Sequence, residues 1–140
     1  MSPDADVIAT RLRLMHELLA DLDSVGPLDA RRLRDERLTR HAVERILTQL
    51  VDLSSSINAH VVSTLTGAAP ATYRESFQAL AEVHVIDDEL ASRLAPSAGM
   101  RNVLTHEYVD IDLTLVAAAA ATARLDFADY IAAVARSFAD

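Results

Sequence analysis

Residues 35–67 read DERLTRHAVERILTQLVDLSSSINAHVVSTLTG, and this stretch decides the fold. It contains no proline, and its single glycine stands at the end, where glycine commonly terminates a helix. Apolar residues recur along it at close to heptad spacing, namely Val43, Leu47, Leu50, Ile57 and Val61. That spacing places them on one face of a helix. The sequence therefore predicts a helix over about 35–66 that forms the backbone of a helical bundle.

Helical patterns also flank this stretch. An apolar stripe begins after Ser2-Pro3 and ends near Gly26-Pro27, and Thr72 to Glu75 has the form of a capping box. Pro96 predicts a break between two helices, because proline has no N–H for the helical hydrogen-bond ladder. The expected helices cover about 2–26, 29–34, 35–66, 72–83, 87–95, 97–110 and a last stretch that begins at Asp112.

Composition agrees with an all-α fold. The chain has 140 residues with only three glycines and four prolines, and aromatic residues make up 4% of it. Helix-forming residues dominate, and a chain of this length is expected to form one domain with a sizeable core. Cysteine is absent, which excludes a disulfide framework and a thiolate metal site.

The sequence shows no signal for export or membrane insertion. Residues 1–6 have neither the basic start nor the apolar core of a signal peptide. The longest apolar run, Leu115 to Ala121, is far too short to cross a bilayer. We therefore expect a cytoplasmic protein with no membrane partner.

The candidate reaction centre is Arg101-Asn102-Val103-Leu104-Thr105-His106-Glu107-Tyr108. This octapeptide brings a guanidinium, an amide, an imidazole and a phenol into two turns of expected helix. Arginine neutralises phosphate charge, histidine transfers protons near pH 7, and an amide fixes an imidazole tautomer. The pattern indicates phosphate-ester chemistry. No carboxylates and histidines show metal-ligand spacing, so no metal site is predicted.

Helix geometry divides this motif into two faces. Asn102 and His106, four residues apart, lie within about 40° of each other, whereas Arg101 and His106 are about 140° apart. An arginine that reaches around its own helix can bridge that angle. Two motif helices paired across a two-fold axis would bring the groups together more readily, so we expect a dimeric site.

Five stretches of the chain carry a resemblance to one family, namely residues 45–47, 57–62, 70–77, 85–91 and 98–108. Together they resemble the HEPN ribonuclease superfamily and, within it, the HepT-like toxins. The resemblance implies an all-α, HEPN-type up-and-down helical bundle of four to five main helices, with residues 1–140 as a single domain. It also implies a metal-independent endoribonuclease, without a cofactor, that acts as a homodimer and as the toxin of a toxin–antitoxin pair. The expected substrate is RNA, either tRNA or mRNA.

Roles for the motif residues follow from RNA chemistry, in which the 2′-hydroxyl attacks the adjacent phosphorus and the 5′-oxygen leaves. We assign proton transfer to His106, stabilisation of phosphate charge to Arg101, and orientation of the imidazole or the phosphate to Asn102. In HepT-like toxins the tyrosine that matches Tyr108 accepts AMP from the antitoxin, a MntA-type minimal nucleotidyltransferase. The resemblance implies the same role here, in which added bulk and charge would block the site.

The charge distribution bears on RNA binding. The net charge of −8 opposes approach to phosphates, yet residues 31–45 hold six arginines against three acidic residues and carry +3. Arg37, Arg40 and Arg45 in this stretch are weak candidates for contacts with RNA or a partner protein. The alternative is a solvated helix face with local ion pairs.

Two other interpretations stay open. The chain can be a non-catalytic HEPN binding module that docks a nucleotidyltransferase, or a purely structural bundle. The presence of Arg101, His106 and Tyr108 together favours the ribonuclease over both. In the long helix, His60 is interpreted as a core histidine, and Asn58 is a candidate to face the motif helix.

Overall fold

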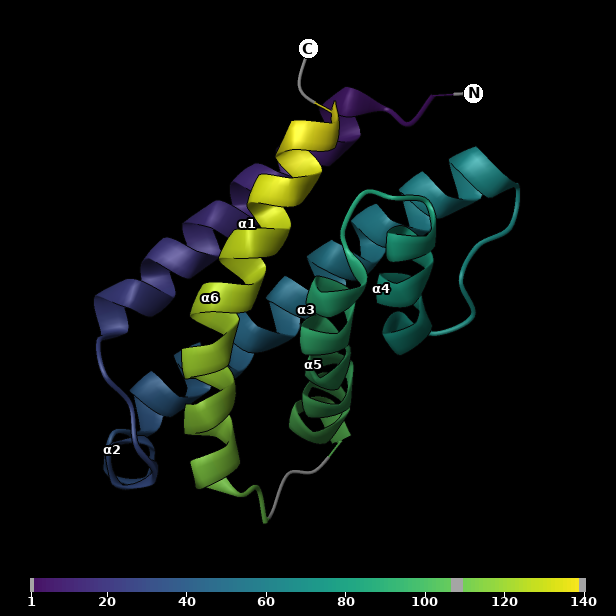
Figure 1. Cartoon of the computed structure of the whole chain (residues 1–140). Helices are drawn as coiled ribbons and strands as arrows, with labels where there is room; N and C mark the ends of the chain where they lie inside the picture. The colour runs from purple at the N-terminus through teal and green to yellow at the C-terminus, as the bar shows by residue number, and fades with distance from the viewer. Residues whose placement is uncertain (1, 107–109, 139–140) are drawn as a thin grey trace.

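The computed structural model describes residues 2–106 and 110–138 and shows an all-α bundle (Figure 1). Within those residues there is no strand, and the helices number six. They are α1 (Ala5–Val25), α2 (Ala30–Asp35), α3 (Arg37–Thr66), α4 (Tyr73–Glu82), α5 (Asp88–His106) and α6 (Leu113–Phe138). The expected all-α class is confirmed. The helix count is slightly above the expected four to five main helices, and the six-residue α2 corresponds to the short helix expected over 29–34.

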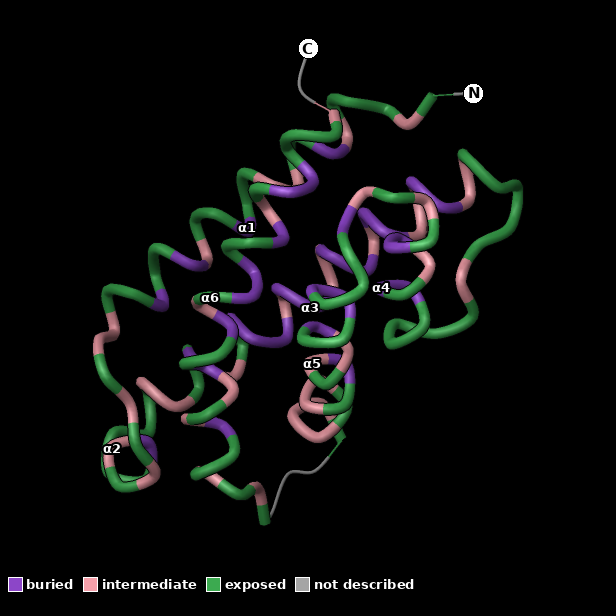
Figure 2. Tube along the Cα trace, in the orientation of Figure 1, coloured by how far each residue is buried: buried purple, intermediate pink, exposed green. Residues whose placement is uncertain are grey.

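Helix α3 is the centre of the bundle and contacts every other helix. Helices α1 and α6 lie side by side against it, while α4 and α5 pack on the remaining part of its surface (Figure 1). The apolar face expected along α3 is confirmed: its heptad residues are all buried, namely Val43, Leu47, Leu50, Ile57 and Val61. Burial alternates with exposure along each helix, as amphipathic elements require (Figure 2).

Local hydrogen bonds explain where the helices begin and end. Gly67 ends α3 with a φ of 81°, a left-handed conformation that glycine adopts without steric cost. The Thr72 hydroxyl accepts from the Glu75 N–H at 3.1 Å, and Asp112 caps α6 in the same way. These caps confirm the expected helix starts. The first helix starts later than expected, because the carboxylate of Asp4 caps it.

Helix α5 contradicts the expected break at Pro96. The helix continues through this residue from Asp88 to His106. Leu94 and Ala98 stand on either side of Pro96, and both are buried against the rest of the bundle. Their burial holds the backbone helical despite the missing N–H, so the residues before and after Pro96 belong to one helix.

A buried chain of hydrogen bonds links α6, α3 and α4. The Tyr130 hydroxyl donates to Asn58 Oδ1 at 2.6 Å, and Asn58 Nδ2 donates to Ser76 Oγ at 3.1 Å. Ser76 in turn donates to the carbonyl oxygen of Tyr73 at 2.6 Å. Asn58 therefore faces α4 and α6 rather than the motif helix, and the chain fixes the first turn of α4.

None of the helices that the described residues form is both long and apolar enough to cross a membrane.

Candidate active site

The motif residues lie in the last turns of α5. Arg101 is partly buried, whereas Asn102 and His106 are exposed, and His106 is the last residue of α5 that the structure describes. Tyr108 lies outside the described residues. The structure therefore presents an amide and an imidazole to solvent beside an arginine that packs against the protein.

Arg101 is held by two neighbours from other helices. Its Nε donates to Asp52 Oδ1 of α3 at 3.0 Å, and its guanidinium carbon lies 5.2 Å from the centre of the Tyr73 ring on α4. The first contact is an ion pair with a hydrogen bond, and the second is a cation–π contact. Asp52 and Tyr73 together fix the orientation of the Arg101 side chain.

This anchoring leaves the phosphate-binding end of Arg101 available. The hydrogen bond uses Nε, and within residues 2–106 and 110–138 neither terminal Nη nitrogen hydrogen-bonds to another group. The Arg101 side chain retains 24% of its exposure. A guanidinium held at Nε can still present two parallel N–H groups to one phosphate. Arg101 is thus both oriented and accessible, as an electrostatic catalyst requires.

Arg93, two turns earlier on α5, shows the opposite arrangement. Its nitrogens contact Asp126 at 2.7 Å, Asp129 at 3.2 Å and Glu89 at 3.6 Å. The hydrogen bond to Asp126 is the main cause that raises the pKa of Arg93, although desolvation opposes it. Three carboxylates already occupy this guanidinium, so Arg93 is a structural cation that joins α5 to α6.

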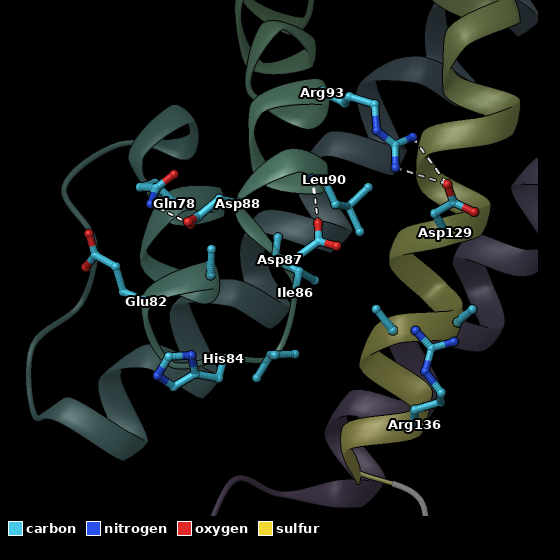
Figure 3. A pocket seen from close by; sticks show the side chains of 14 residues that line it. Gln78, Glu82, His84, Ile86, Asp87, Asp88, Leu90, Arg93, Asp129 and Arg136 are labelled. Atoms are coloured by element: carbon cyan, nitrogen blue, oxygen red, sulfur yellow. Dashed lines mark hydrogen bonds and ion pairs between the residues drawn. The ribbon is translucent and has the colours of Figure 1, made fainter.

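Arg93 also borders a hollow of about 870 Å³ between the α4–α5 connection and α6 (Figure 3). Asp87 and Asp88 contribute carboxylates to this hollow at the start of α5, where they bond to Leu90 N–H and Gln78. The motif stands about 20 Å further along the helix axis, at a rise of about 1.5 Å per residue. The hollow and the motif are therefore separate features.

The three candidate arginines of the basic stretch differ in their surroundings. Arg40 pairs with Glu44 at 2.8 Å, and Arg37 is exposed at the start of α3. Arg45 lines a hollow between α1 and α3 that Asp52 also lines. Of the three, Arg45 is the one whose surface adjoins the partner of Arg101. Ion pairs with neighbours four residues away also occur at Arg31 and Arg32.

Asp52 and Tyr73 are the site residues that the sequence did not reveal. Asp52 is separated from Arg101 by 49 residues, so only the packing of α3 on α5 brings them together. The only signal of Asp52 in the sequence was a charged residue between Val51 and Leu53, in the long helix.

His60 accepts a hydrogen bond from the Asp4 N–H at 2.8 Å and is half-buried. It ties the start of α1 to α3.

No cluster of three or more metal-ligating side chains occurs in the part of the chain that the structure describes.

Comparison with known proteins adds to this geometry. Residues 15–134 match the family described as Ribonuclease HepT-like. The chain belongs to the HepT-like ribonuclease family. The resemblance to HepT-like HEPN proteins is thereby confirmed. A tRNA nuclease HepT from Aphanizomenon flos-aquae is 33% identical over 106 residues, which cover 76% of this chain and 72% of that protein.

Solved structures confirm the HEPN-type fold. A tri-AMPylated HEPN toxin of Shewanella oneidensis, in complex with an MNT antitoxin, has a TM-score of 0.83 at 21% identity and covers 94% of this chain and 98% of that one. YutE of Bacillus subtilis, a cytosolic protein of unknown function, also has a TM-score of 0.83, at 17% identity and 99% and 92% coverage. At such identities the likeness establishes the fold alone.

Proposed function

We propose that the protein is a metal-independent endoribonuclease toxin whose reaction centre contains Arg101, Asn102 and His106. The observation that carries this proposal is the arrangement of Arg101. Asp52 and Tyr73 hold it, no group among residues 2–106 and 110–138 hydrogen-bonds to its two Nη nitrogens, and Asn102 and His106 are exposed on the same helix. The similarity to a protein named tRNA nuclease HepT supports RNA as the proposed substrate class, with tRNA the first candidate and mRNA the second.

The reaction is an internal transfer at phosphorus. The 2′-oxygen forms a bond to the adjacent phosphorus, the bond from phosphorus to the 5′-oxygen breaks, and a cyclic phosphate and a 5′-hydroxyl result. His106 takes the 2′-proton or supplies the proton that the 5′-oxygen needs, and water carries the other proton. Arg101 stabilises the charge on the non-bridging oxygens, and Asn102 orients the imidazole or the phosphate.

The direct test compares Arg101→Ala and His106→Ala with Arg13→Ala and His16→Ala, which make the same changes at exposed positions on α1. Each motif variant should lower the cleavage rate of tRNA at least about 100-fold, because it removes charge stabilisation or proton transfer. The α1 variants should retain wild-type rates, and circular dichroism should show all four proteins folded. Full activity in folded His106→Ala would refute the mechanism.

The same proposal includes a homodimer with a shared site. Arg101 turns toward α3 and α4, while His106 is exposed at the end of α5. Mixing Arg101→Ala with His106→Ala chains tests this arrangement. If each site takes Arg101 from one chain and His106 from the other, half of the dimers regain one site, and roughly a quarter of wild-type activity returns. No recovery after chain exchange would place both groups in one chain.

The regulatory part of the proposal concerns Tyr108, the AMP acceptor. Its phenolic oxygen attacks the α-phosphorus of ATP on a MntA-type nucleotidyltransferase, and pyrophosphate leaves. Mass spectrometry should find one or more AMP groups on Tyr108 and a silenced nuclease, and Tyr108→Phe should escape both because it lacks the acceptor oxygen. If the partner silences Tyr108→Phe equally well, inhibition acts by docking, and docking replaces the covalent switch.

The basic stretch supplies a secondary RNA contact. Arg45, which shares a hollow with Asp52, is the first candidate, ahead of Arg37 and of Arg40, whose charge Glu44 already neutralises.

A further inference from the structure

A groove of about 480 Å³ runs between the first turn of α4 and the middle of α5, helices that pack side by side (Figure 1). We call it the α4–α5 groove. Its lining residues are Thr72, Tyr73, Arg74, Ala98, Gly99, Arg101 and Asn102. Two of the sequence stretches that carry the family resemblance, residues 70–77 and 98–108, thus meet at one surface. Two of these lining residues, Arg101 and Asn102, belong to the proposed reaction centre.

Gly99 is the informative residue of this groove. Glycine inside a helix is destabilising relative to alanine, so it usually answers a conformational or steric demand. Neither demand applies to Gly99. The glycines with positive φ angles are Gly26 and Gly67, and a Cβ added to Gly99 would meet no atom within 4 Å. The missing side chain instead keeps the floor of the groove open. Close approach of a ligand to the backbone is a recognised use of glycine.

The walls of the groove have the chemistry of a nucleotide site. Tyr73 is 41% exposed, and the Arg101 guanidinium carbon lies over its ring at 5.2 Å from the centre, so an aromatic ring and a guanidinium both border the space. Bases stack on such surfaces in proteins that bind single-stranded RNA. Arg74 and Asn102 are both exposed and supply a cation for a phosphate and an amide for a base edge.

The charges that line the α4–α5 groove favour an anionic ligand. Among the residues that the structure describes, two arginines and no acidic side chain line the groove, in a chain whose net charge is −8. The larger hollow beside Arg93 is lined instead by four carboxylates, those of Glu82, Asp87, Asp88 and Asp129, against the two guanidinium groups of Arg93 and Arg136. An anion is favoured in the first and disfavoured in the second. The volume of the α4–α5 groove falls within the range of about 300–1,000 Å³ for small-molecule sites.

We propose that the α4–α5 groove is a subsite for one nucleotide of the RNA chain next to the scissile phosphate. The base lies over Gly99 against the surface formed by Tyr73 and Arg101, and its phosphate contacts Arg74. This inference rests on the proposed ribonuclease function, because it takes Arg101 and Asn102 as the point where cleavage occurs. It adds a binding role for Tyr73, Arg74 and Gly99.

The test fills the groove and measures RNA binding apart from cleavage. All proteins carry His106→Ala, and the dissociation constant for fluorescently labelled total tRNA is measured by anisotropy. Gly99→Leu should weaken binding by about tenfold, the lower part of the range for loss of one stacked base. Ser92→Leu puts the same side chain on an exposed position of α5 outside the groove and should leave binding unchanged. Leucine is a better helix former than glycine, so the helix is retained.

A second variant tests the phosphate contact. Arg74→Gln should reduce the slope of log affinity against log salt concentration by about 0.7 to 0.9, the effect of one lost phosphate contact. Unchanged affinity in Gly99→Leu together with an unchanged salt slope in Arg74→Gln would overturn the subsite. The subsite is also overturned if Gly99→Leu binds tRNA normally but no longer binds the nucleotidyltransferase, because the groove then holds a protein. Absence of tRNA binding in the His106→Ala parent would refute the proposed function as well.

Discussion

Replacing Tyr130 by phenylalanine should lower the free energy of unfolding by about 1–3 kcal/mol, because it strands a buried acceptor. Tyr130 and Asn58 are both fully buried, and the hydroxyl donates to Asn58 Oδ1 at 2.6 Å. The ring packs edge-on against Phe77 and Phe127 at 6.3 and 6.5 Å, and phenylalanine keeps both contacts. The cost therefore comes from the hydrogen bond and not from a cavity.

The expected size of the thermal shift follows from chain length. Unfolding entropy of about 2.1 cal/mol/K per residue gives roughly 0.3 kcal/mol/K for this chain, so the melting temperature should fall by about 3–10 °C. Thermal unfolding followed by circular dichroism measures it. Tyr73→Phe is the matched control, since it removes the hydroxyl of a half-exposed tyrosine and should change stability by less than about 0.5 kcal/mol. Equal melting temperatures for the two variants would refute the reasoning.

Alkaline pH gives a second measurement on the same residue. Burial raises the pKa of Tyr130 well above the usual value of 10. The unfolded chain therefore releases this proton near pH 10 while the folded chain retains it. The contribution of Tyr130 to the free energy of unfolding is fully present below pH 10 and is lost above it, at up to about 1.4 kcal/mol per pH unit. The difference in stability between wild type and Tyr130→Phe should shrink above pH 10, and a constant difference would contradict the assignment.

Two further substitutions test particular contacts. Asp52→Asn removes the charge that holds Arg101 Nε, so tRNA cleavage should slow by about tenfold. The free energy of unfolding should change by no more than about 1 kcal/mol, because the ion pair is partly exposed. The same change in an Arg101→Ala background should have no effect on cleavage, and an additive effect would show that Asp52 acts elsewhere. His84→Gly should raise the free energy of unfolding in urea by about 0.5–1 kcal/mol, because His84 has a φ of 66°, which a residue with a Cβ adopts only at a cost. The control is His84→Ala, which keeps the Cβ and should give no such gain.

Local signals in the sequence predicted most of the secondary structure. Thr72, Asp112 and Gly67 act through hydrogen bonds and φ angles within a few residues, and each marks a helix boundary in the structure. Pro96 is also a local signal, but its cost is outweighed by burial of Leu94 and Ala98, which depends on the other helices. Boundaries set by local bonds are readable from sequence, whereas a boundary that tertiary burial overrides is not.

The candidate site divides in the same way. The types and spacing of Arg101, Asn102 and His106 were sufficient to nominate them, because their chemistry is contained in one helix. Asp52 and Tyr73 contact Arg101 from α3 and α4, and nothing in their local sequence fixes that geometry.

The continuous path of α5 through Pro96 has a consequence for local opening of the molecule. Proline offers no amide hydrogen, so the carbonyl of Ser92 lacks its usual partner and the hydrogen-bond ladder of α5 is interrupted there. The half of α5 before Pro96 has three buried residues, Leu90, Ala91 and Leu94. Among the described residues of the half that follows, Ala98 is the only buried one. The segment that carries the motif therefore opens at lower free energy than the segment that anchors it, and its amides exchange with solvent deuterium sooner.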